Sequence, residues 1–315
     1  MDNHNAYFIE FVNNLLDNLL SNYSNLVDDE IQKHINFLKE TLDITNFKFE
    51  EDFYYYHNAL MYFWFLFPIK ECQNEYINEC KKHNKIFLPY VCKKDHIIYE
   101  SNYKKNNIYL PEEYLNGNGG VCEDVFFLNH KDSPHRYPIE LLDDLYYNTD
   151  KTINVIDCGS SEGILEILIA SRYENINRFF FILIDPAKEW NQYIKKTLKD
   201  INAKYIIINK FLDDTFNLND IDVDEVHFIK MDIEGGEVLA CKKLDEICKR
   251  DHPIMAICTY HNQDDYNIIS NLFKEYNYSN IYPSKNYMLF IDNPWLNPPF
   301  FRRGLCIAHN LKNDD

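Results

Sequence analysis

The run Val155-Ile156-Asp157-Cys158-Gly159-Ser160-Ser161-Glu162-Gly163 decides the fold of this chain. It begins with apolar, β-branched residues, continues with small ones, and leads into the apolar-periodic segment Ile164 to Ala170. A buried strand followed by a tight turn and a helix has this pattern. The stretch therefore predicts the first strand and helix of an α/β domain.

A second apolar run, Phe179 to Ile184, ends in Asp185-Pro186. Asp185 follows Asp157 by 28 residues (185 − 157), which leaves room for one helix and one loop. That separation is typical of two neighbouring parallel strands. We therefore expect the two aspartates to lie at the same edge of one sheet.

The glycines after the first strand distinguish two kinds of nucleotide site. A nicotinamide or flavin site needs G-x-G-x-x-G, because its second glycine lets the backbone approach a pyrophosphate. Here three residues separate Gly159 from Gly163, and the carboxylate of Asp157 would repel phosphate. S-adenosylmethionine fits better, since it carries a sulfonium and an ammonium and no phosphate, and Asp185 would bind its ribose hydroxyls. The alternative is that the two glycines only turn a corner between strand and helix.

Charge and length exclude several classes of protein. The 315 residues allow one large domain or two, and the formal net charge is -18. The sequence pI is about 5.0, so no basic surface is available for phosphates. We therefore expect no nucleic-acid partner, but a small molecule or a glycan as acceptor.

The nine cysteines and the hydropathy pattern bear on location. The cysteines form no C-x-x-C pair, which is typical of reduced thiols in a cytoplasmic protein and gives no zinc-ligand spacing. The N-terminus is acidic and polar, so no secretory signal is expected there. The most apolar run, Ala59 to Ile69, is well short of the roughly 20 residues of a membrane span.

The predicted organisation has three parts. Residues 1–85 form an N-terminal helical extension, which shapes the acceptor pocket or makes a homodimer. Residues 86–150 form a small strand and helix segment with a glycine-rich loop at Asn116 to Gly120, either a connector or a lid. Residues 151–315 form the cofactor-binding domain.

The cofactor-binding domain is predicted to be a doubly wound, mostly parallel seven-stranded sheet of the Rossmann-like type. Further strands are expected at Tyr205 to Ile208, Val226 to Met231 and Ile254 to Cys258. Tyr287 to Ile291 and Gly304 to Ala308 are expected to close the sheet as an antiparallel pair, because no crossover helix lies between them.

The fourth strand carries the most specific motif, Phe228-Ile229-Lys230-Met231-Asp232-Ile233-Glu234-Gly235-Gly236-Glu237. It resembles the D-[IV]-E-G-x-E signature of the FkbM family of S-adenosylmethionine-dependent methyltransferases. The stretch around Tyr260-His261 and the run Asn286 to Phe290 are also similar to that family. The resemblance implies methyl transfer to a hydroxyl of a sugar, a glycan or a secondary metabolite. Asp185-Pro186 departs from the Glu-Pro that is frequent in relatives.

His261, Asp232 and Glu234 are the candidate catalytic residues. His261 follows the fifth strand and could act as general base, oriented by a carboxylate of the fourth strand end. The alternative is a loop histidine that caps the next helix. Asp232, Glu234 and Glu237 could instead hold magnesium, although the same acids suit an ordinary helix start, and no metal is predicted.

The predicted cofactor residues come from four strand ends. They are Asp157, Gly159, Ser160, Ser161, Gly163, Asp185 and Pro186 after the first two strands, Phe211, Leu212 and Asp213 after the third, and Asp232 after the fourth. Two other functions stay open: a nicotinamide-dependent oxidoreductase, and a non-catalytic binding protein on a methyltransferase scaffold. The predicted function is O-methylation of a sugar hydroxyl with S-adenosylmethionine.

Overall fold

The computed structural model describes the second half of the chain almost completely and the first half in part. The described residues are 14, 16–29, 31–33, 35–36, 90–92, 96–100, 105–111, 133–285, 287–289, 297–298 and 301–312. Most of the predicted N-terminal helical extension and the glycine-rich loop at Asn116 to Gly120 lie outside them. Of the N-terminal extension, the described residues include helical ones on both sides of a 3-10 turn, η1 (Ser24–Leu26).

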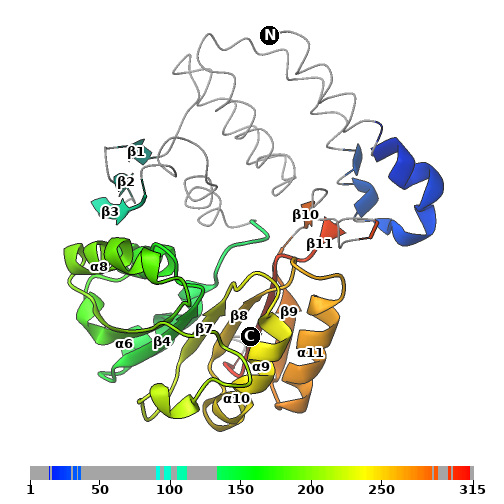
Figure 1. Ribbon diagram of the computed structural model, residues 1–315. Coiled ribbons are helices and arrows are strands. Elements are labelled where there is room, and N and C mark those ends of the chain that lie inside the picture. The colour runs from blue at the N-terminus through cyan, green and yellow to red at the C-terminus, as the bar shows by residue number, and fades with distance from the viewer. Residues whose placement is uncertain are drawn as a thin grey trace.

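A seven-stranded sheet forms the centre of the described fold (Figure 1). In spatial order it contains β6 (Lys204–Ile208), β5 (Phe179–Ile184), β4 (Ile153–Cys158), β7 (Phe228–Met231), β8 (Ile254–Cys258), β12 (Leu305–His309) and β9 (Asn280–Pro283). The first five strands are parallel, and β12 runs antiparallel to both β8 and β9. The predicted doubly wound, mostly parallel sheet is confirmed.

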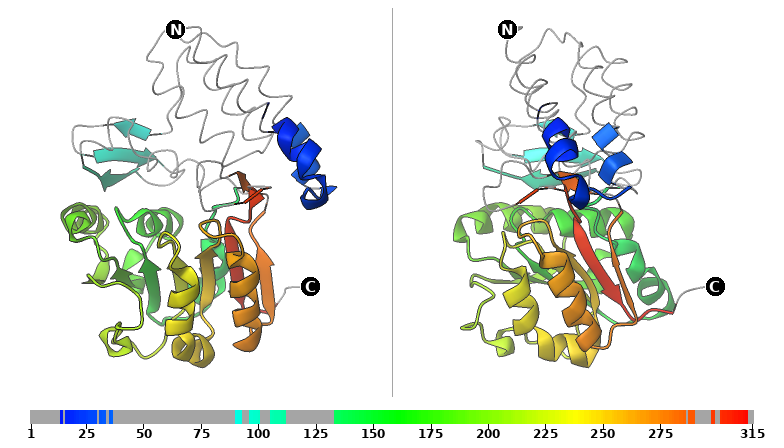
Figure 2. Two further views of the ribbon diagram at one scale, coloured as in Figure 1. Left: turned by 45° about the vertical axis from the view of Figure 1, so that its right-hand side comes forward. Right: turned by 90° about the vertical axis from the view of Figure 1, so that its right-hand side faces the viewer.

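Alternation along the strands divides the core between the two faces of the sheet. Successive side chains of a strand point to opposite faces, so Val155 and Ile156 of β4 belong to different apolar clusters. The cluster of Val155 contains α7 (Ile164–Arg172) and α8 (Asn191–Asp200). The other includes three helices. These are α9 (Glu237–Lys243), α10 (Asp245–Asp251) and α11 (Asp265–Glu275). The two sets of helices thus cover opposite faces (Figure 2).

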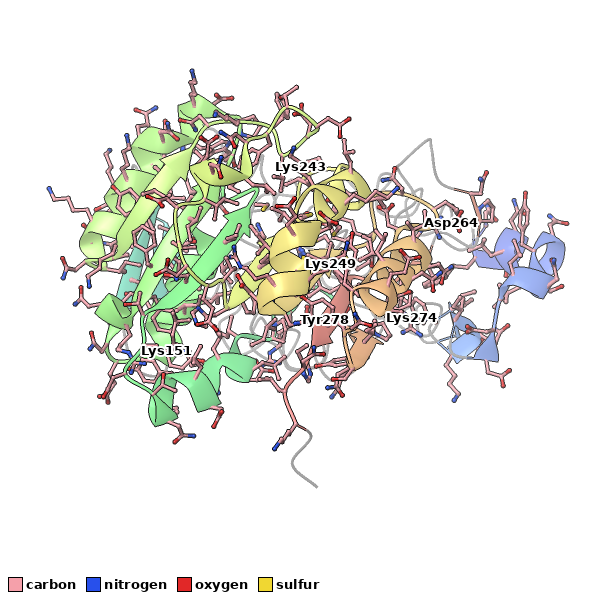
Figure 3. All side chains as sticks on the ribbon, turned by 90° about the horizontal axis from the view of Figure 1, so that it is seen from below. Lys151, Lys243, Lys249, Asp264, Lys274 and Tyr278 are labelled. Atoms are coloured by element: carbon pink, nitrogen blue, oxygen red, sulfur yellow. The ribbon has the colours of Figure 1, made fainter. Side chains whose placement is uncertain are left out.

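Each helix on the second face has a basic residue in its last turn. Lys243, Lys249 and Lys274 lie in the last turns of α9, α10 and α11 and are labelled in Figure 3. Cations at a helix C-terminus are stabilising, because the carbonyl groups there carry partial negative charge. Each lysine therefore stabilises the C-terminal end of its own helix.

A smaller antiparallel sheet packs near the first face. It contains β1 (Tyr90–Cys92), β2 (His96–Glu100) and β3 (Lys105–Tyr109). The Asn106 amide donates to the Ser171 hydroxyl at 2.9 Å, and the Tyr109 backbone N–H donates to Thr197 Oγ1 at 3.1 Å. These two bonds attach β3 to α7 and α8.

The remaining elements are short. They are η4 (Ile139–Leu142), α6 (Asp143–Asn148), η5 (Ile176–Arg178), η6 (Lys188–Trp190), η7 (Leu218–Asp220), β10 (Met288–Leu289) and β11 (Phe301–Arg302). η4 and α6 follow one another directly and lead to β4. α9 and α10 are separate helices, which meet at Leu244.

The closing strand pair differs from the prediction. Met288–Leu289 pairs with Phe301–Arg302 in a separate two-stranded sheet. The partner of β12 is β9, whose sequence Asn-Ile-Tyr-Pro has too little apolar alternation to predict a strand. β9 is an edge strand, and an edge position tolerates both the polar residue and the proline.

Two expectations from composition can be compared with the described residues. Cys158, Cys241, Cys248, Cys258 and Cys306 are free and buried, as the lack of pairing motifs predicts. Within the described ranges, no helix combines the length and the apolar character that crossing a bilayer requires.

Candidate functional site

A cavity of about 720 Å³ lies at the carboxyl ends of β4, β5 and β7. Ligand pockets in open α/β sheets form at this edge and have volumes of this order. The turn after β4 forms one wall, the loop after β6 a second, and the segment after β7 a third. The cavity is thus built where the sequence places the candidate residues.

Gly159 brings two of these walls together. Its φ is +77°, and a Cβ there would lie 1.8 Å from the backbone oxygen of Asp232. A residue with a side chain therefore cannot replace it without moving the end of β7. Gly163 also has a left-handed φ, +88°, but it begins α7 and does not line the cavity.

Asp185 is held by backbone groups. Its Oδ2 accepts from the Ser161 N–H at 2.9 Å and its Oδ1 from the Ala187 N–H at 2.8 Å. Each carboxylate oxygen can accept a further hydrogen bond. The side chain is 8% exposed and lines the cavity. It is therefore pre-oriented to accept from two neighbouring hydroxyls, as the ribose of the predicted cofactor would offer.

Asp157 lies in the cavity wall but has a partner that the sequence reasoning did not assign. Lys230 Nζ is 2.9 Å from Asp157 Oδ1 and donates to the Gly159 carbonyl at 2.6 Å. Burial raises the pKa of the Asp157 carboxyl more than the nearby Lys230 charge lowers it. The only signal for Lys230 was an unexpected charge inside the apolar strand Phe228–Met231.

Two further acids near the turn are buried. Burial raises the pKa of Glu162 to about 7, against smaller opposing effects of hydrogen bonds and Lys230. Glu166, on α7, is fully buried, and among the described residues neither of its carboxyl oxygens has a hydrogen-bond partner. Burial and the charge of Asp157 raise its pKa as well.

Acidic groups outnumber basic ones around the cavity. Its lining contains the carboxyl groups of Asp157, Glu162, Asp185, Asp213, Asp232 and Glu234 and the lysines Lys210 and Lys230. An excess of carboxylates attracts a cation and repels phosphate. The donor set therefore fits S-adenosylmethionine, with its sulfonium and ammonium, and does not fit a dinucleotide.

The loop after β6 supplies the apolar part of the cavity. Phe211, Leu212 and Asp213 all line it, together with Pro186 and Trp190. Phe211 is 69% exposed, so an aromatic face is available to a flat ring. The hydroxyl of Thr215 donates to Asp213 at 2.6 Å and fixes the end of this loop.

Asp232 stands at the end of β7 and gathers polar side chains around it. The Tyr260 hydroxyl donates to its Oδ1 at 3.0 Å, His135 Nε2 lies 3.3 Å from Oδ2, and His261 Nε2 lies 3.6 Å from Oδ1. Burial opposes the charge of Asp232, but His135, Lys230 and His261 outweigh it and hold the pKa of this carboxyl well below its usual range. Asp232 is therefore a carboxylate at neutral pH.

His261 lies behind Asp232 and not in the cavity wall. Its Nδ1 is 3.0 Å from Glu237 Oε1, which also accepts from the Ile233 N–H at 2.9 Å. Burial lowers the pKa of His261, but Glu237, Asp232 and Glu234 outweigh burial and raise it. The histidine that does line the cavity is His135, in the loop before η4.

The structure places most predicted residues in one cavity. Glu234 also lines it, but its carboxylate is 91% exposed and its backbone φ is +58°. Glu237 is fully buried, and the three acids of the motif surround His261 from different sides, Glu237 at Nδ1 and Asp232 and Glu234 at Nε2. Sequence reasoning missed His135, and no motif signalled it.

Comparisons with known proteins agree with the motif at β7. The methyltransferase FkbM domain matches residues 64–279. No curated protein matches the chain.

Solved methyltransferases are similar over part of the fold. Methyltransferase FkbM from Methylobacillus flagellatus is 19% identical over 51% of this chain, with a TM-score of 0.38. The match spans 44% of that protein's own length. An S-adenosylmethionine-dependent O-methyltransferase from Thermotoga maritima is 12% identical, with 72% of this chain and 87% of that one covered and a TM-score of 0.38. M. capricolum TrmK, in complex with S-adenosylhomocysteine, is 16% identical over 55% of this chain and 71% of that one, with a TM-score of 0.34.

The family assignment rests on the domain match, which spans 216 of the 315 residues (279 − 64 + 1) and includes β4, β5, β6, β7 and β8. The methyltransferase family supports the cofactor predicted from the sequence, S-adenosylmethionine. The chain belongs to the methyltransferase FkbM domain family.

Proposed function

We propose that this protein transfers the methyl group of S-adenosylmethionine to a hydroxyl of a carbohydrate. The observation that carries the proposal is the series of contacts from Asp232 after β7, through His261 after β8, to Glu237 at the start of α9, with Asp232 in the cavity wall. It offers a carboxylate to hold a hydroxyl and an imidazole to take its proton.

The cofactor would lie across the ends of β4 and β5. Asp185 would accept from the ribose hydroxyls, and Phe211 and Leu212 would cover the adenine. The acids around the turn, Asp157 and Glu162 among them, would lie near the cationic groups. Bound there, the cofactor supplies an electrophilic methyl group on a good leaving group.

Asp232 would hold the acceptor. Its carboxylate is ionised, and the Tyr260 hydroxyl fixes its orientation. The acceptor hydroxyl would donate to this carboxylate, and its proton would pass to Nε2 of His261. A positioned base contributes about 10²–10⁴-fold to such a reaction.

Glu237 and Glu234 would assist His261 in different ways. Glu237 is fixed by the Ile233 N–H and faces Nδ1, so it orients the ring and stabilises the imidazolium. Glu234 lies 3.5 Å from Nε2 at the exposed rim, where it could accept from further acceptor hydroxyls. A polar, hydroxyl-rich ligand suits this rim, and the resemblance to FkbM proteins supports a sugar.

Two alternatives predict different experimental outcomes. A nicotinamide-dependent oxidoreductase is disfavoured by the acidic lining. A non-catalytic binding protein would bind S-adenosylhomocysteine but would not transfer methyl groups.

Methyl-labelled S-adenosylmethionine offered with a panel of sugars, nucleotide sugars and glycans tests the proposal. We expect label in one class of sugar, and thermal stabilisation by S-adenosylhomocysteine but not by NAD. His261→Asn should lower turnover by at least about 100-fold while S-adenosylhomocysteine binding is retained. His252→Asn is the matched control, because His252 lies after α10 and bonds to the Tyr276 carbonyl. Stabilisation by NAD alone, or unchanged turnover of His261→Asn, would refute the proposed roles.

We further propose a cytoplasmic location, which the five buried free thiols support. A homodimer through the N-terminal extension stays a prediction, which gel filtration with light scattering can check.

A further inference from the structure

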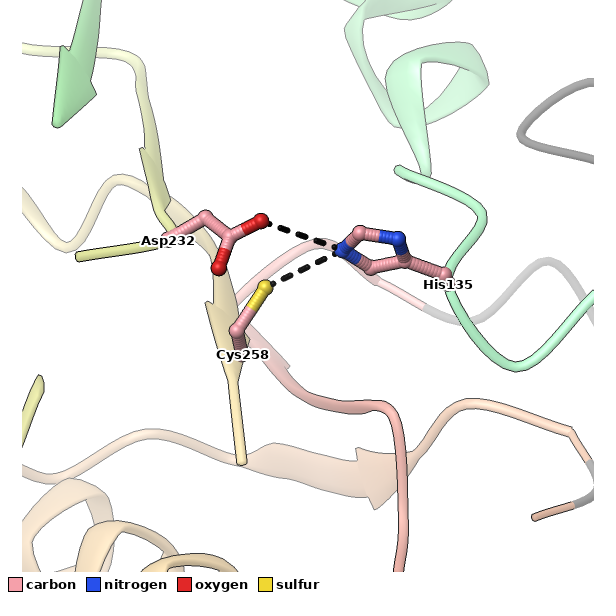
Figure 4. A group of neighbouring side chains, drawn as sticks. All are labelled: His135, Asp232 and Cys258. Atoms are coloured by element: carbon pink, nitrogen blue, oxygen red, sulfur yellow. Dashed lines mark hydrogen bonds and ion pairs between the residues drawn. The ribbon is translucent and has the colours of Figure 1, made fainter. Parts of the chain in front are cut away.

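His135, Asp232 and Cys258 bring three different donor atoms together (Figure 4). His135 Nε2 lies 3.3 Å from Asp232 Oδ2 and 3.3 Å from Cys258 Sγ. All three donor atoms lie within 4.8 Å of one another. The residues are far apart in sequence, 97 positions (232 − 135) and 26 positions (258 − 232), and only the fold joins them.

The surrounding structure fixes all three residues. The His135 N–H donates to Ser133 Oγ at 3.2 Å, and the Pro134 carbonyl accepts from Ser284 Oγ at 2.5 Å. A Cβ on Gly304 would lie 1.9 Å from that same carbonyl, so β12 and the His135 loop pack without a gap. Cys258 ends the fully buried strand β8, and its side chain has no exposure.

Asp232 bonds to both His135 and the thiol of Cys258, and Nε2 of His135 has further polar neighbours. Nε2 of His135 also lies 3.3 Å from the Tyr137 hydroxyl, so three heteroatoms surround one ring nitrogen. That nitrogen either donates one proton or accepts one. If it donates to Asp232, it cannot also accept from the thiol of Cys258.

We propose that His135, Asp232 and Cys258 form a binding site for a divalent transition-metal ion of the Zn²⁺ type. Zinc binds nitrogen at about 2.0–2.1 Å, oxygen at about 2.0–2.2 Å and thiolate sulfur at about 2.3 Å in a tetrahedron. In that geometry neighbouring donors are roughly 3.3–3.6 Å apart. The two distances of 3.3 Å around Nε2 agree with this spacing.

The donor types select the metal. Imidazole and thiolate suit zinc and similar ions, whereas magnesium and calcium need oxygen ligands. On binding, a metal–sulfur bond forms, the S–H bond of Cys258 breaks, and its proton goes to solvent. The thiolate and the Asp232 carboxylate then balance the two charges of the ion, while Lys230 is neutralised by Asp157.

The fourth position of the ion would face the cavity, because His135 and Asp232 both line it. Three protein ligands and one open position are typical of a catalytic zinc site. The ion would use Oδ2 of Asp232, and His261 lies on the side of Oδ1. Binding of the ion is independent of the proposed function. The use of the ion does rest on the proposed function: the ion would bind the acceptor hydroxyl and lower the pKa of that hydroxyl.

The neighbouring group Asp232, Glu237 and His261 is a poorer metal site. Its histidine faces Glu237 through Nδ1 and Asp232 through Nε2. One ion cannot occupy both sides of an imidazole ring. The geometry therefore assigns a proton-carrying role to that group and the metal to His135, Asp232 and Cys258.

Cobalt binding to the full chain, after removal of metals by a chelator, tests the site. We expect about one Co²⁺ per chain and a near-ultraviolet charge-transfer absorption from a thiolate ligand. Cys258→Ser should abolish that absorption. Cys306→Ser is the matched control, because Cys306 is equally buried on the adjacent strand β12, and it should retain the absorption. His135→Asn should weaken Zn²⁺ binding, measured by competition, by at least about 100-fold.

X-ray absorption on the wild-type chain with bound Zn²⁺ provides a test that needs no variant. It should show one sulfur neighbour at about 2.3 Å. A zinc spectrum without sulfur, clearly less than one ion per chain, or a cobalt absorption that survives Cys258→Ser would overturn the proposal. If the thiolate absorption forms and no sugar is methylated, the metal site stands and the proposed function fails.

Discussion

Lys230 and Asp157 form an ion pair on adjacent strands beneath the cavity, with Nζ 2.9 Å from Oδ1 and both side chains buried. The sequence reasoning reserved Asp157 for the ammonium of the cofactor. The pair shows that the protein already neutralises this carboxylate. Lys230 also donates to the Gly159 carbonyl, so the ion pair is joined to the turn after β4.

Lys230→Met should destabilise the protein strongly. It leaves Asp157 charged and without its partner in the core, and breaking a buried pair costs about 3–5 kcal/mol of unfolding free energy. Urea denaturation measures the effect. The double variant Lys230→Met with Asp157→Asn should recover most of the loss, since no uncompensated charge remains. Equal losses in the single and double variants would contradict this account.

Glu162 should make the free energy of unfolding decrease as the pH rises, in the absence of cofactor. Its pKa is about 7 in the folded chain and about 4.5 in the unfolded chain, so the folded state binds the proton more tightly. The contribution of Glu162 to the free energy of unfolding is therefore most favourable below about pH 4.5. It becomes less favourable as the pH rises to about 7. The difference is on the order of 3 kcal/mol.

Glu162→Gln should remove that dependence. The variant is expected to be more stable than wild type above pH 7 and about equal to it near pH 4, by thermal or urea unfolding across this range. Comparing the two proteins at each pH cancels the contributions of other titrating groups. A difference that does not change between pH 4 and pH 8 would rule out the raised pKa.

Gly159→Ala should disturb both the turn and the end of β7. The alanine Cβ would need a left-handed backbone and would meet the Asp232 oxygen at 1.8 Å. We expect a stability loss of more than about 2 kcal/mol, together with loss of S-adenosylhomocysteine binding.

Gly236→Ala is the matched control for that variant. The Gly236 Cβ would lie 3.2 Å from the Ile233 side chain and 3.7 Å from its backbone oxygen, and the φ of Gly236 is −87°. It should keep near wild-type stability and cofactor affinity. If both glycine variants behaved alike, the close approach of the two loops would not be the cause.

Asp185→Asn should weaken cofactor binding. The amide nitrogen would face one of the two backbone N–H groups that now donate to the carboxylate, and the charge toward the ribose would be lost. Hydrogen bonds to charged groups contribute about 1.5–3 kcal/mol, so the Kd of S-adenosylhomocysteine should rise roughly 10- to 150-fold. Isothermal titration measures it. Asp245→Asn, which removes a surface pair with Lys249, should leave the Kd unchanged.

The predicted strands show what local pattern determines. Phe179–Ile184 and Ile254–Cys258 match their predicted bounds, because a strand covered on both faces is a continuous apolar run. β9 was missed, since an edge strand is half-solvated and can contain polar residues and proline. The prediction of the antiparallel pair that closes the sheet was wrong for the same reason.

Some residues of the candidate site could likewise be predicted from local sequence, and others could not. Gly159, Asp185 and Asp232 follow predicted strands directly, so the parallel sheet brings them to one edge. His135 comes from a loop 97 positions before Asp232, and no pattern in the sequence links them. Lys230 and Glu237 stood inside the quoted motif, but their partners depend on side-chain directions across strands and helices.

The sequence by itself determined the sheet, the cofactor edge and the family, because strand periodicity, turn residues and one motif are local properties of the chain. Only the tertiary structure decided that Asp157 is paired with Lys230 and that His261 is paired with Glu237. It also decided that His135 and Cys258 lie next to Asp232. Those pairings depend on distances between separate elements, and packing sets such distances.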